Sequence, residues 1–202
     1  PSMRPVWMIR IGLFLYDHLA RREILPASET VDLRRHEAGR PLKERWRAGI
    51  MYSDGWVDDA RLVVLNALDA HERGATVLTR TRCVAVRREG RLWRADLQRA
   101  DGSRGVVQAR ALVNAAGPWA ASFLREAAGW TRVQPLRLVK GSHIVVRRLF
   151  EHPYAYIFQN PDRRIVFAIP FEREFTLIGT TDVEIGGDPG AARCDPSEIE
   201  YL

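Results

Sequence analysis

The sequence predicts an α+β protein of mixed helices and antiparallel sheets. Between residues 81 and 110, β-branched and alternating runs are joined by short polar turns, which is typical of an antiparallel meander. Four more apolar runs, separated by prolines, follow between residues 136 and 179. Stretches with helical spacing precede the meander. A composition of 46% hydrophobic and 28% charged residues over 202 positions is ordinary for a globular chain.

A first helix is predicted over residues 7–22. Apolar side chains recur on one of its faces at helical spacing: Met8, Ile11, Leu15 and Leu19. We expect this helix to be mostly buried. Its apolar part is interrupted by charged residues and is too short to span a bilayer. It also lacks the small-residue cleavage site of a signal peptide.

A surface segment is predicted after this helix, because residues 32–40 are polar and charged. Pro41 is suited to the first position of a short helix over residues 41–47. The basic side chains of that helix are Lys43, Arg45 and Arg47. They could contact phospholipid, and a solvated helix face is the other interpretation.

The middle of the chain is predicted to hold a strand, a helix and the meander. Residues 50–57 have the composition of a strand, and Asp58 or Asp59 then caps a helix that runs to Glu72. The strand-like runs that follow are 75–79, 81–88, 92–98 and 105–110. Asp101-Gly102 is a strong signal for a hairpin turn inside the meander.

A strand-to-helix turn is predicted at residues 111–119. The apolar run 111–116 is typical of a buried strand, which we expect to join a parallel sheet. Gly117 permits a close backbone approach, and Pro118 can open a helix that ends at Gly129. Small residues at such a turn leave room for a ligand against the backbone.

The last third of the chain is predicted to form a sheet that serves as the floor of a substrate domain. Its strands are expected at 136–148, 154–159, 164–169 and 175–179, with a bend at Gly141. Residues 196–202 look like the capped start of a helix. This ending, and a first residue that is not methionine, indicate a fragment of a longer protein.

Charge and cysteine content limit the possible functions. The excess of basic residues gives a formal net charge of +6, which suits an anionic substrate, an acidic membrane surface or nucleic acid, or is simply a solvated surface. The two cysteines, Cys83 and Cys194, have no metal-ligand spacing and indicate a reducing compartment. The histidines are scattered, so we expect no metal site.

Several motifs together resemble the FAD-dependent, quinone-linked glycerol-3-phosphate dehydrogenase family. They are WMIRIGL at 7–13, YSDGWVDDARL at 52–62, NAAGPW at 114–119, KGSHIVV at 140–146 and IGTTD at 178–182. Only 32–40 and 120–132 depart from the expected pattern. No Gly-x-Gly-x-x-Gly turn occurs, so the chain lacks the pyrophosphate-binding element of a dinucleotide domain.

The resemblance implies a fold and a division into domains. It implies part of a glutathione-reductase-like FAD domain, with its β-meander, together with an antiparallel substrate-domain sheet. The expected borders are a first part of the substrate domain at 1–52, a partial FAD domain at 53–129 and a second part of the substrate domain at 130–202. FAD is the implied cofactor, which we do not expect the fragment to retain by itself.

The resemblance also implies residues that line the flavin. Cys83 and Val84 match the position where main chain meets the adenine, although inert packing is the safer interpretation of the cysteine. Ala116 and Gly117 would approach the flavin, or Gly117 would only permit the turn. Trp119 belongs to the same wall, and its indole is better suited to a core or domain contact than to flavin stacking.

His143 is the candidate catalytic residue. Oxidation of a secondary alcohol by hydride loss requires removal of the hydroxyl proton, and imidazole exchanges protons near neutral pH. A core histidine bonded to the backbone is the equally weighted alternative. Candidate substrate-binding residues are Arg137 and Lys140, which suit a phosphate, and Thr181 and Asp182, which form either a polar active-site loop or a plain turn.

The expected activity of the full-length parent is oxidation of sn-glycerol 3-phosphate to dihydroxyacetone phosphate, with electrons passing to a membrane quinone. Peripheral contact with the cytoplasmic face of the inner membrane and a homodimer are further expectations. The fragment alone is expected to be inactive. The alternatives are a related FAD-dependent oxidoreductase acting on an amino acid or hydroxy acid, and a basic non-enzymatic module. Because no aromatic-basic run typical of nucleic-acid binding occurs, we expect no nucleic-acid partner.

Overall fold

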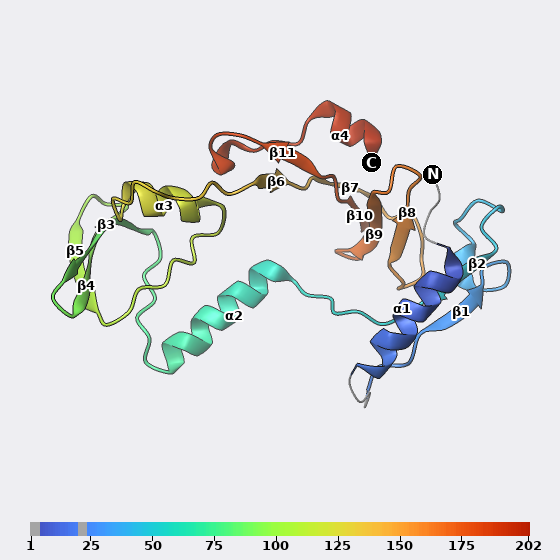
Figure 1. Cartoon of the computed structure of the whole chain (residues 1–202). Coiled ribbons are helices and arrows are strands. Elements are labelled where there is room, and N and C mark those ends of the chain that lie inside the picture. Colours follow the sequence, from blue (N-terminus) through green and yellow to red (C-terminus); the bar gives the residue numbers. More distant parts are fainter. Residues whose placement is uncertain (1–4, 20–23) are drawn as a thin grey trace. The chain divides into compact units, whose positions relative to one another are not determined.

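The computed structural model describes residues 5–19 and 24–202 (Figure 1). The chain divides into two compact units, which are described separately. Unit 1 consists of Pro1–Trp56, Val139–Glu184 and Ala191–Leu202, and unit 2 consists of Val57–Leu138 and Ile185–Gly190. Helices are mixed with antiparallel sheets in the chain, so the predicted α+β class is confirmed.

A four-stranded antiparallel sheet is the centre of unit 1. Its strand order is β7-β10-β9-β8, and the strands are β7 His143–Arg147, β8 Tyr156–Gln159, β9 Ile165–Phe171 and β10 Phe175–Gly179. Val166, Ala168 and Thr176 are buried within it. The register pairs His143 with Gly179 at one end of the sheet. The sheet predicted for the last third of the chain is therefore present.

Unit 1 also contains a two-stranded hairpin, in which β1 Glu29–Asp32 pairs with β2 Ala48–Met51. The sequence analysis missed β1 and placed the later strand at 50–57. The predicted helix over 41–47 is wrong. A 3-10 helix, η1 Glu37–Gly39, and successive turns occupy the connection instead, because the chain must return within a few residues to pair with β1.

The first helix, α1 Val6–His18, is present, although the last predicted residues, 20–23, lie outside the described part of the chain. The expectation that α1 is mostly buried is wrong, because none of its residues is buried. Trp7, Ile11 and Phe14 are more than half exposed, since no described segment covers them. The C-terminal helix α4 Pro196–Tyr201 begins with a capping box between Asp195 and Glu198.

The predicted meander forms unit 2 together with two helices (Figure 1). Its strands are β3 Thr81–Glu89, β4 Leu92–Arg99 and β5 Arg104–Ala109, in the order β3-β4-β5. The preceding helix is α2 Asp59–Glu72, whose N-cap Asp58 accepts a hydrogen bond from the amide of Arg61. After the meander come η2 Gly117–Trp119 and α3 Ala120–Glu126.

Two predicted strands of unit 2 are not formed. Residues 75–79 and 111–116 adopt no strand, because neither segment has a neighbouring strand to complete a ladder within the described residues. The predicted strand 136–148 is divided at Gly141-Ser142 into β6 Leu138–Lys140 and β7, as the expected bend requires. β6 forms a two-stranded ladder with β11 Val183–Ile185, and η3 Pro189–Ala191 follows.

Candidate functional site

His143 lies at the start of β7, at the end of the unit 1 sheet, and is exposed. Its ring rests against the backbone of Gly179, its partner in β10. A Cβ at position 179 would lie 2.6 Å from Cγ and 2.8 Å from Nε2 of the imidazole, which is closer than carbon atoms approach without repulsion. Glycine at this position is therefore what allows the imidazole to occupy its place.

Two loops beside His143 are bonded to each other. The amide of Ser142 donates to Oγ1 of Thr181 over 2.8 Å, and the amide of Thr181 donates to the carbonyl of Ser142 over 3.3 Å. Gly141 lies so close to Thr180 Oγ1 that a Cβ there would collide with it. The loop before β7 and the loop after β10 therefore pack as one piece.

Glu198, in the first turn of α4, lies under both loops and is only 5% exposed. One carboxylate oxygen, Oε1, accepts from the hydroxyls of Ser142 at 2.9 Å and Thr181 at 2.5 Å. The other oxygen, Oε2, accepts from the amide of Asp195 at 2.8 Å and lies 2.7 Å from Nζ of Lys140. These donors, led by the Asp195 amide and then the Lys140 ammonium, lower the pKa of Glu198 to about 2.

Lys140, at the end of β6, is held by partners within unit 1. Its Nζ lies 2.6 Å from Oδ2 of Asp195 and 2.7 Å from Oε2 of Glu198, and it also donates to the carbonyl of Arg193. An ammonium group has three donors, so all three are in use. The two carboxylates, Asp195 first, raise the pKa of Lys140. A bound phosphate would have to take the place of one of these partners.

The structure brings together only some of the predicted substrate-binding residues. Lys140 and Thr181 both contact Glu198, next to His143. Thr181 is buried, whereas Asp182 beside it is exposed. Arg137 is exposed, precedes β6 and belongs to unit 2. The sequence analysis missed Glu198, and the available signal was the acidic residue three positions after Asp195, which is the pattern of a capping box.

Val84 and Cys83, the predicted adenine-contacting pair, lie in β3 at an irregularity. The β3–β4 register shifts between Cys83 and Ala85, so Val84 has no partner in β4. Such a bulge leaves the main chain of one residue without its ladder bonds. The Cys83 thiol donates to the carbonyl of Ala85, and burial raises the pKa of this thiol. Its chemistry is that of an inert packing residue.

The predicted flavin turn is fixed by Asn114. Its side chain donates to the carbonyl of Ala120 over 2.9 Å and accepts from the amide of Ala116 over 3.2 Å. Gly117 has a φ of +53°, and a Cβ there would meet no atom within 4 Å. Glycine is therefore required at position 117 because of its left-handed backbone conformation and not because of crowding. Trp119 is 47% exposed and donates from Nε1 to Asp188 over 3.3 Å, so its indole makes a contact within unit 2.

Two features of unit 2 could bring main chain close to a ligand. The bulge leaves Val84 without a partner residue in β4. The turn at Ala116 and Gly117 offers a backbone with open space in front of it. Both are what close contact with a dinucleotide requires, because side chains at these places would keep it away from the main chain.

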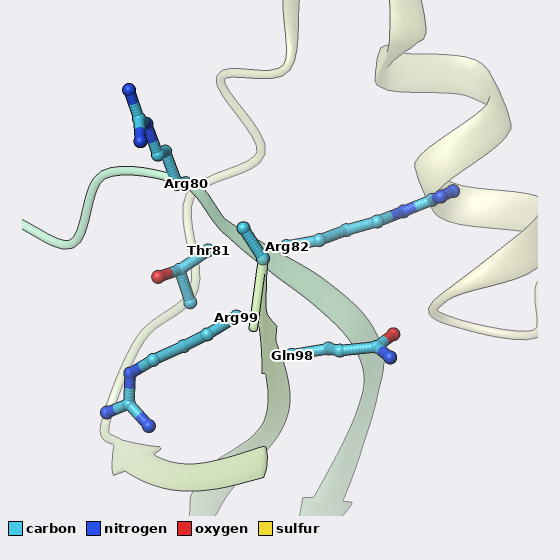
Figure 2. A pocket seen from close by; sticks show the side chains of 6 residues that line it. Arg80, Thr81, Arg82, Gln98 and Arg99 are labelled. Atoms are coloured by element: carbon cyan, nitrogen blue, oxygen red, sulfur yellow. The ribbon is translucent and has the colours of Figure 1, made fainter. Parts of the chain in front are cut away.

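A hollow at the start of β3, close in sequence to the Val84 bulge, is lined by three arginines and three uncharged residues. They come from the start of β3 and the end of β4: Arg80, Thr81, Arg82, Gln98, Arg99 and Ala100. Figure 2 shows that the side chains of Arg80, Arg82 and Arg99 point in different directions. Arg82 pairs with Glu126 at 3.7 Å. A tight anion site needs converging donors, so this hollow is a weaker candidate for a substrate site than the His143 region.

Metal and membrane features can be assessed for residues 5–19 and 24–202. Within these ranges, no group of three or more histidine, cysteine or acidic side chains is placed to hold a metal ion. Over the same residues, no helix combines the length and the apolar character that crossing a bilayer requires.

Comparison with known proteins identifies relatives along the whole chain. The model of the family described as FAD dependent oxidoreductase matches residues 3–202. A glycerol-3-phosphate dehydrogenase from Pseudomonas aeruginosa is 55% identical over 202 residues, covering 100% of this chain and 39% of that protein. A D-erythritol 1-phosphate dehydrogenase from Brucella abortus is 46% identical over 203 residues, covering 100% of this chain and 40% of that protein.

A solved structure is similar as well. The crystal structure of the glycerol-3-phosphate dehydrogenase from Bacillus halodurans complexed with FAD has a TM-score of 0.64 and 30% sequence identity. The match covers 77% of this chain and 31% of that protein. The chain thus spans about two fifths of the length of the curated relatives above. The resemblance noted in the sequence is confirmed, and the chain belongs to the FAD dependent oxidoreductase family.

Proposed function

We propose that the chain is the central part of a flavoprotein that oxidises sn-glycerol 3-phosphate to dihydroxyacetone phosphate. The observation that carries the proposal is the 55% identity, along all 202 residues, to a protein named glycerol-3-phosphate dehydrogenase. The grouping of His143 with the bonded loops of unit 1 supports it. Because the chain spans only part of its relatives, the reaction is a property of the full-length protein.

In this proposal unit 1 belongs to the substrate domain and unit 2 to the FAD domain. The sequence placed the borders after residues 52 and 129, whereas the units divide after Trp56 and Leu138 and unit 2 also includes Ile185–Gly190. The segments 75–79 and 111–116 would then pair with strands supplied by the rest of the FAD domain. The main chain of Val84 and the Ala116-Gly117 turn would line the cofactor.

His143 is proposed as the group that takes the proton of the secondary hydroxyl. The reaction removes a hydride from the carbon and a proton from the oxygen, which leaves the ketone. FAD, when bound, accepts the hydride, so the protein supplies orientation and a proton acceptor. The exposed imidazole, fixed on one side by Gly179, is suited to that task.

The substrate-binding residues keep distinct proposed roles. Arg137 and Asp182 are exposed and can contact the phosphate and the hydroxyls of the substrate directly. Lys140 and Thr181 are held by Glu198 and contribute mainly by fixing the loops.

A second candidate substrate is D-erythritol 1-phosphate. The relative named for that substrate is 46% identical over its match to the whole chain. Both substrates are polyol phosphates with a secondary alcohol, so the same proton acceptor serves either. A hydroxy acid or an amino acid is the alternative from outside this class.

Transfer of the electrons to a membrane quinone is the expected next step. It requires the full-length protein to approach the bilayer, and we propose peripheral contact with the cytoplasmic face of the inner membrane. The formal charge of +6 supports attraction to an anionic lipid surface. A homodimer is compatible with this arrangement.

The test is a substrate comparison with the purified full-length flavoprotein. Reduction of an artificial electron acceptor is followed with sn-glycerol 3-phosphate, D-erythritol 1-phosphate, a 2-hydroxy acid and an amino acid. We expect turnover with the first substrate, and faster turnover with the second would select the alternative polyol phosphate. Turnover with an amino acid or hydroxy acid but neither phosphate would overturn the proposal.

A further inference from the structure

We propose that Glu198 is a positioning residue, whose ionised carboxylate fixes the place of His143 without touching the substrate. The inference rests on the proposed function, because it assigns His143 the role of proton acceptor. It concerns a side chain from α4, 55 residues further along the sequence than the imidazole that it would govern.

The first step of the argument is that the carboxylate is completely used. Each oxygen of Glu198 faces two donors: hydroxyls on one side, and an amide and an ammonium on the other. A carboxylate has about four lone-pair positions, so no capacity is left for a substrate or for water. A buried acid with four protein partners acts through those partners.

The second step is that the partners belong to both loops beside the imidazole. Ser142 is the residue before His143, and Thr181 is two residues after Gly179, on which the imidazole rests. Oε1 of Glu198 joins the hydroxyls of these two residues. The carboxylate therefore sets the separation of the loop that carries His143 and the loop that supports its ring.

The third step is that the packing leaves little freedom for compensation. Ser142 and Thr181 also exchange hydrogen bonds directly, at 2.8 and 3.3 Å. A Cβ added to Gly141 would collide with Thr180 Oγ1 and would lie 3.2 Å from the carbonyl oxygen of Thr181. A shift of one loop is therefore transmitted to the other, and from there to the imidazole.

The replacement Glu198→Gln tests the need for the charge. An amide has one acceptor oxygen, so its NH2 group must face either the Lys140 and Asp195 donors or the two hydroxyls. In the first orientation donors oppose donors, and in the second the hydroxyls must rotate away from their present acceptor. Either way the side chain at position 198 can no longer accept from all four donors, so its hold on the two loops is weakened. Glu198→Asp keeps the charge and shortens the side chain, so it is the conservative variant for rescue.

The experiment uses the full-length holoenzyme as wild type, E198Q, E198D and V166A. Val166 is buried in β9 and is not one of the four donors to Glu198, so V166A serves as the control for a loss of sheet stability alone. We expect E198Q to lower kcat at least tenfold with a smaller change in KM and normal flavin content. E198D should recover part of kcat, and V166A should lower Tm with kcat near wild type.

A second readout does not depend on turnover. The rate at which diethylpyrocarbonate modifies His143 is measured by peptide mass spectrometry, with exposed His71 as the internal standard. We expect E198Q to change the rate at His143 at least threefold relative to His71, and V166A to leave the ratio unchanged. An unchanged ratio in E198Q, or a loss of kcat that V166A reproduces at equal Tm, would overturn the positioning role.

The two readouts separate this inference from the proposed function. A wild-type protein that oxidises no polyol phosphate would refute the proposed function. In that case the modification rate still decides whether Glu198 positions His143. An active wild type with E198Q of equal kcat would refute the positioning role and leave the proposed function intact.

Discussion

Replacing Gly179 by alanine tests how closely the imidazole of His143 depends on the sheet beneath it. The added Cβ would lie 2.6 Å from Cγ of the ring, whereas non-bonded carbon atoms at their optimal separation are about 3.5 Å apart. The ring must therefore retreat by about 1 Å. A misplacement of that size at a reacting group can cost about 100-fold in rate.

The stability cost of Gly179→Ala should be small by comparison. Overpacking in a core costs about 1–3 kcal/mol. His143 is exposed and its ring can move toward solvent, so we expect about 1 kcal/mol in this case. The predicted result is a large loss of kcat with only a slight fall in the urea midpoint.

The assay is steady-state oxidation of sn-glycerol 3-phosphate by the full-length enzyme, with Gly105→Ala as the matched control. Gly105 also lies in a strand, but a Cβ there would meet no atom within 4 Å. We expect Gly105→Ala to retain wild-type kcat. If Gly179→Ala is as active as Gly105→Ala, the assignment of His143 as proton acceptor at this place is refuted.

Three further predictions concern pH and backbone conformation. The fold lowers the pKa of Glu198 from 4.5 to about 2, so as the pH falls the unfolded state binds this proton first. The stability that the ionised carboxylate contributes should be complete above pH 4.5 and should be lost as the pH falls toward 2. In urea unfolding, the difference in stability between wild type and Glu198→Gln should shrink over that range, and a constant difference would contradict the prediction. His152 donates from Nε2 to Tyr156 over 2.8 Å, its buried Nδ1 has no partner among the described residues, and burial lowers the pKa of the ring. Nitrogen NMR should therefore find a neutral His152 ring at neutral pH, and protonation of this ring on acidification should destabilise the fold. A charged ring at neutral pH would disprove this prediction. Gly117→Ala should cost about 1–2 kcal/mol because of its φ of +53° and should weaken FAD binding, as measured by flavin fluorescence, with Gly105→Ala unchanged in both.

The local part of the fold could be predicted from sequence because its signals are local. The meander follows from alternation and from Gly102, whose φ of +84° fits the predicted hairpin turn. The helix starting after Asp58 follows from its cap. The bend at Gly141 was predicted too, and the close contact with Thr180 gives its physical reason.

The parts that were wrong depend on partners distant in sequence. Residues 75–79 and 111–116 have the composition of buried strands, but strands exist only where neighbours complete the ladder. The apolar face of α1 predicted burial, and burial needs a covering surface that the described residues do not provide. Residues 41–47 had a helix-starting proline, but closing the β1–β2 hairpin required turns instead.

The candidate site was predictable to a similar extent. His143, Lys140 and Thr181 stand in motifs that can be read directly from the sequence. Their common partner could not be, because the contacts from Lys140 and Ser142 to Glu198 span more than 50 residues and depend on where α4 packs. A capping box explains one hydrogen bond of that glutamate and gives no hint of the other three.

The central claim is that this chain supplies the proton acceptor for oxidation of a polyol phosphate. The most direct measurement is the anaerobic rate of flavin reduction in the full-length protein mixed with sn-glycerol 3-phosphate, for wild type and for His143→Gln. We expect rapid loss of flavin absorbance in wild type. In the variant, we expect a rate at least about 100-fold lower, with the same flavin content. Equal rates in the two proteins, or no reduction in wild type by either polyol phosphate, would contradict the account.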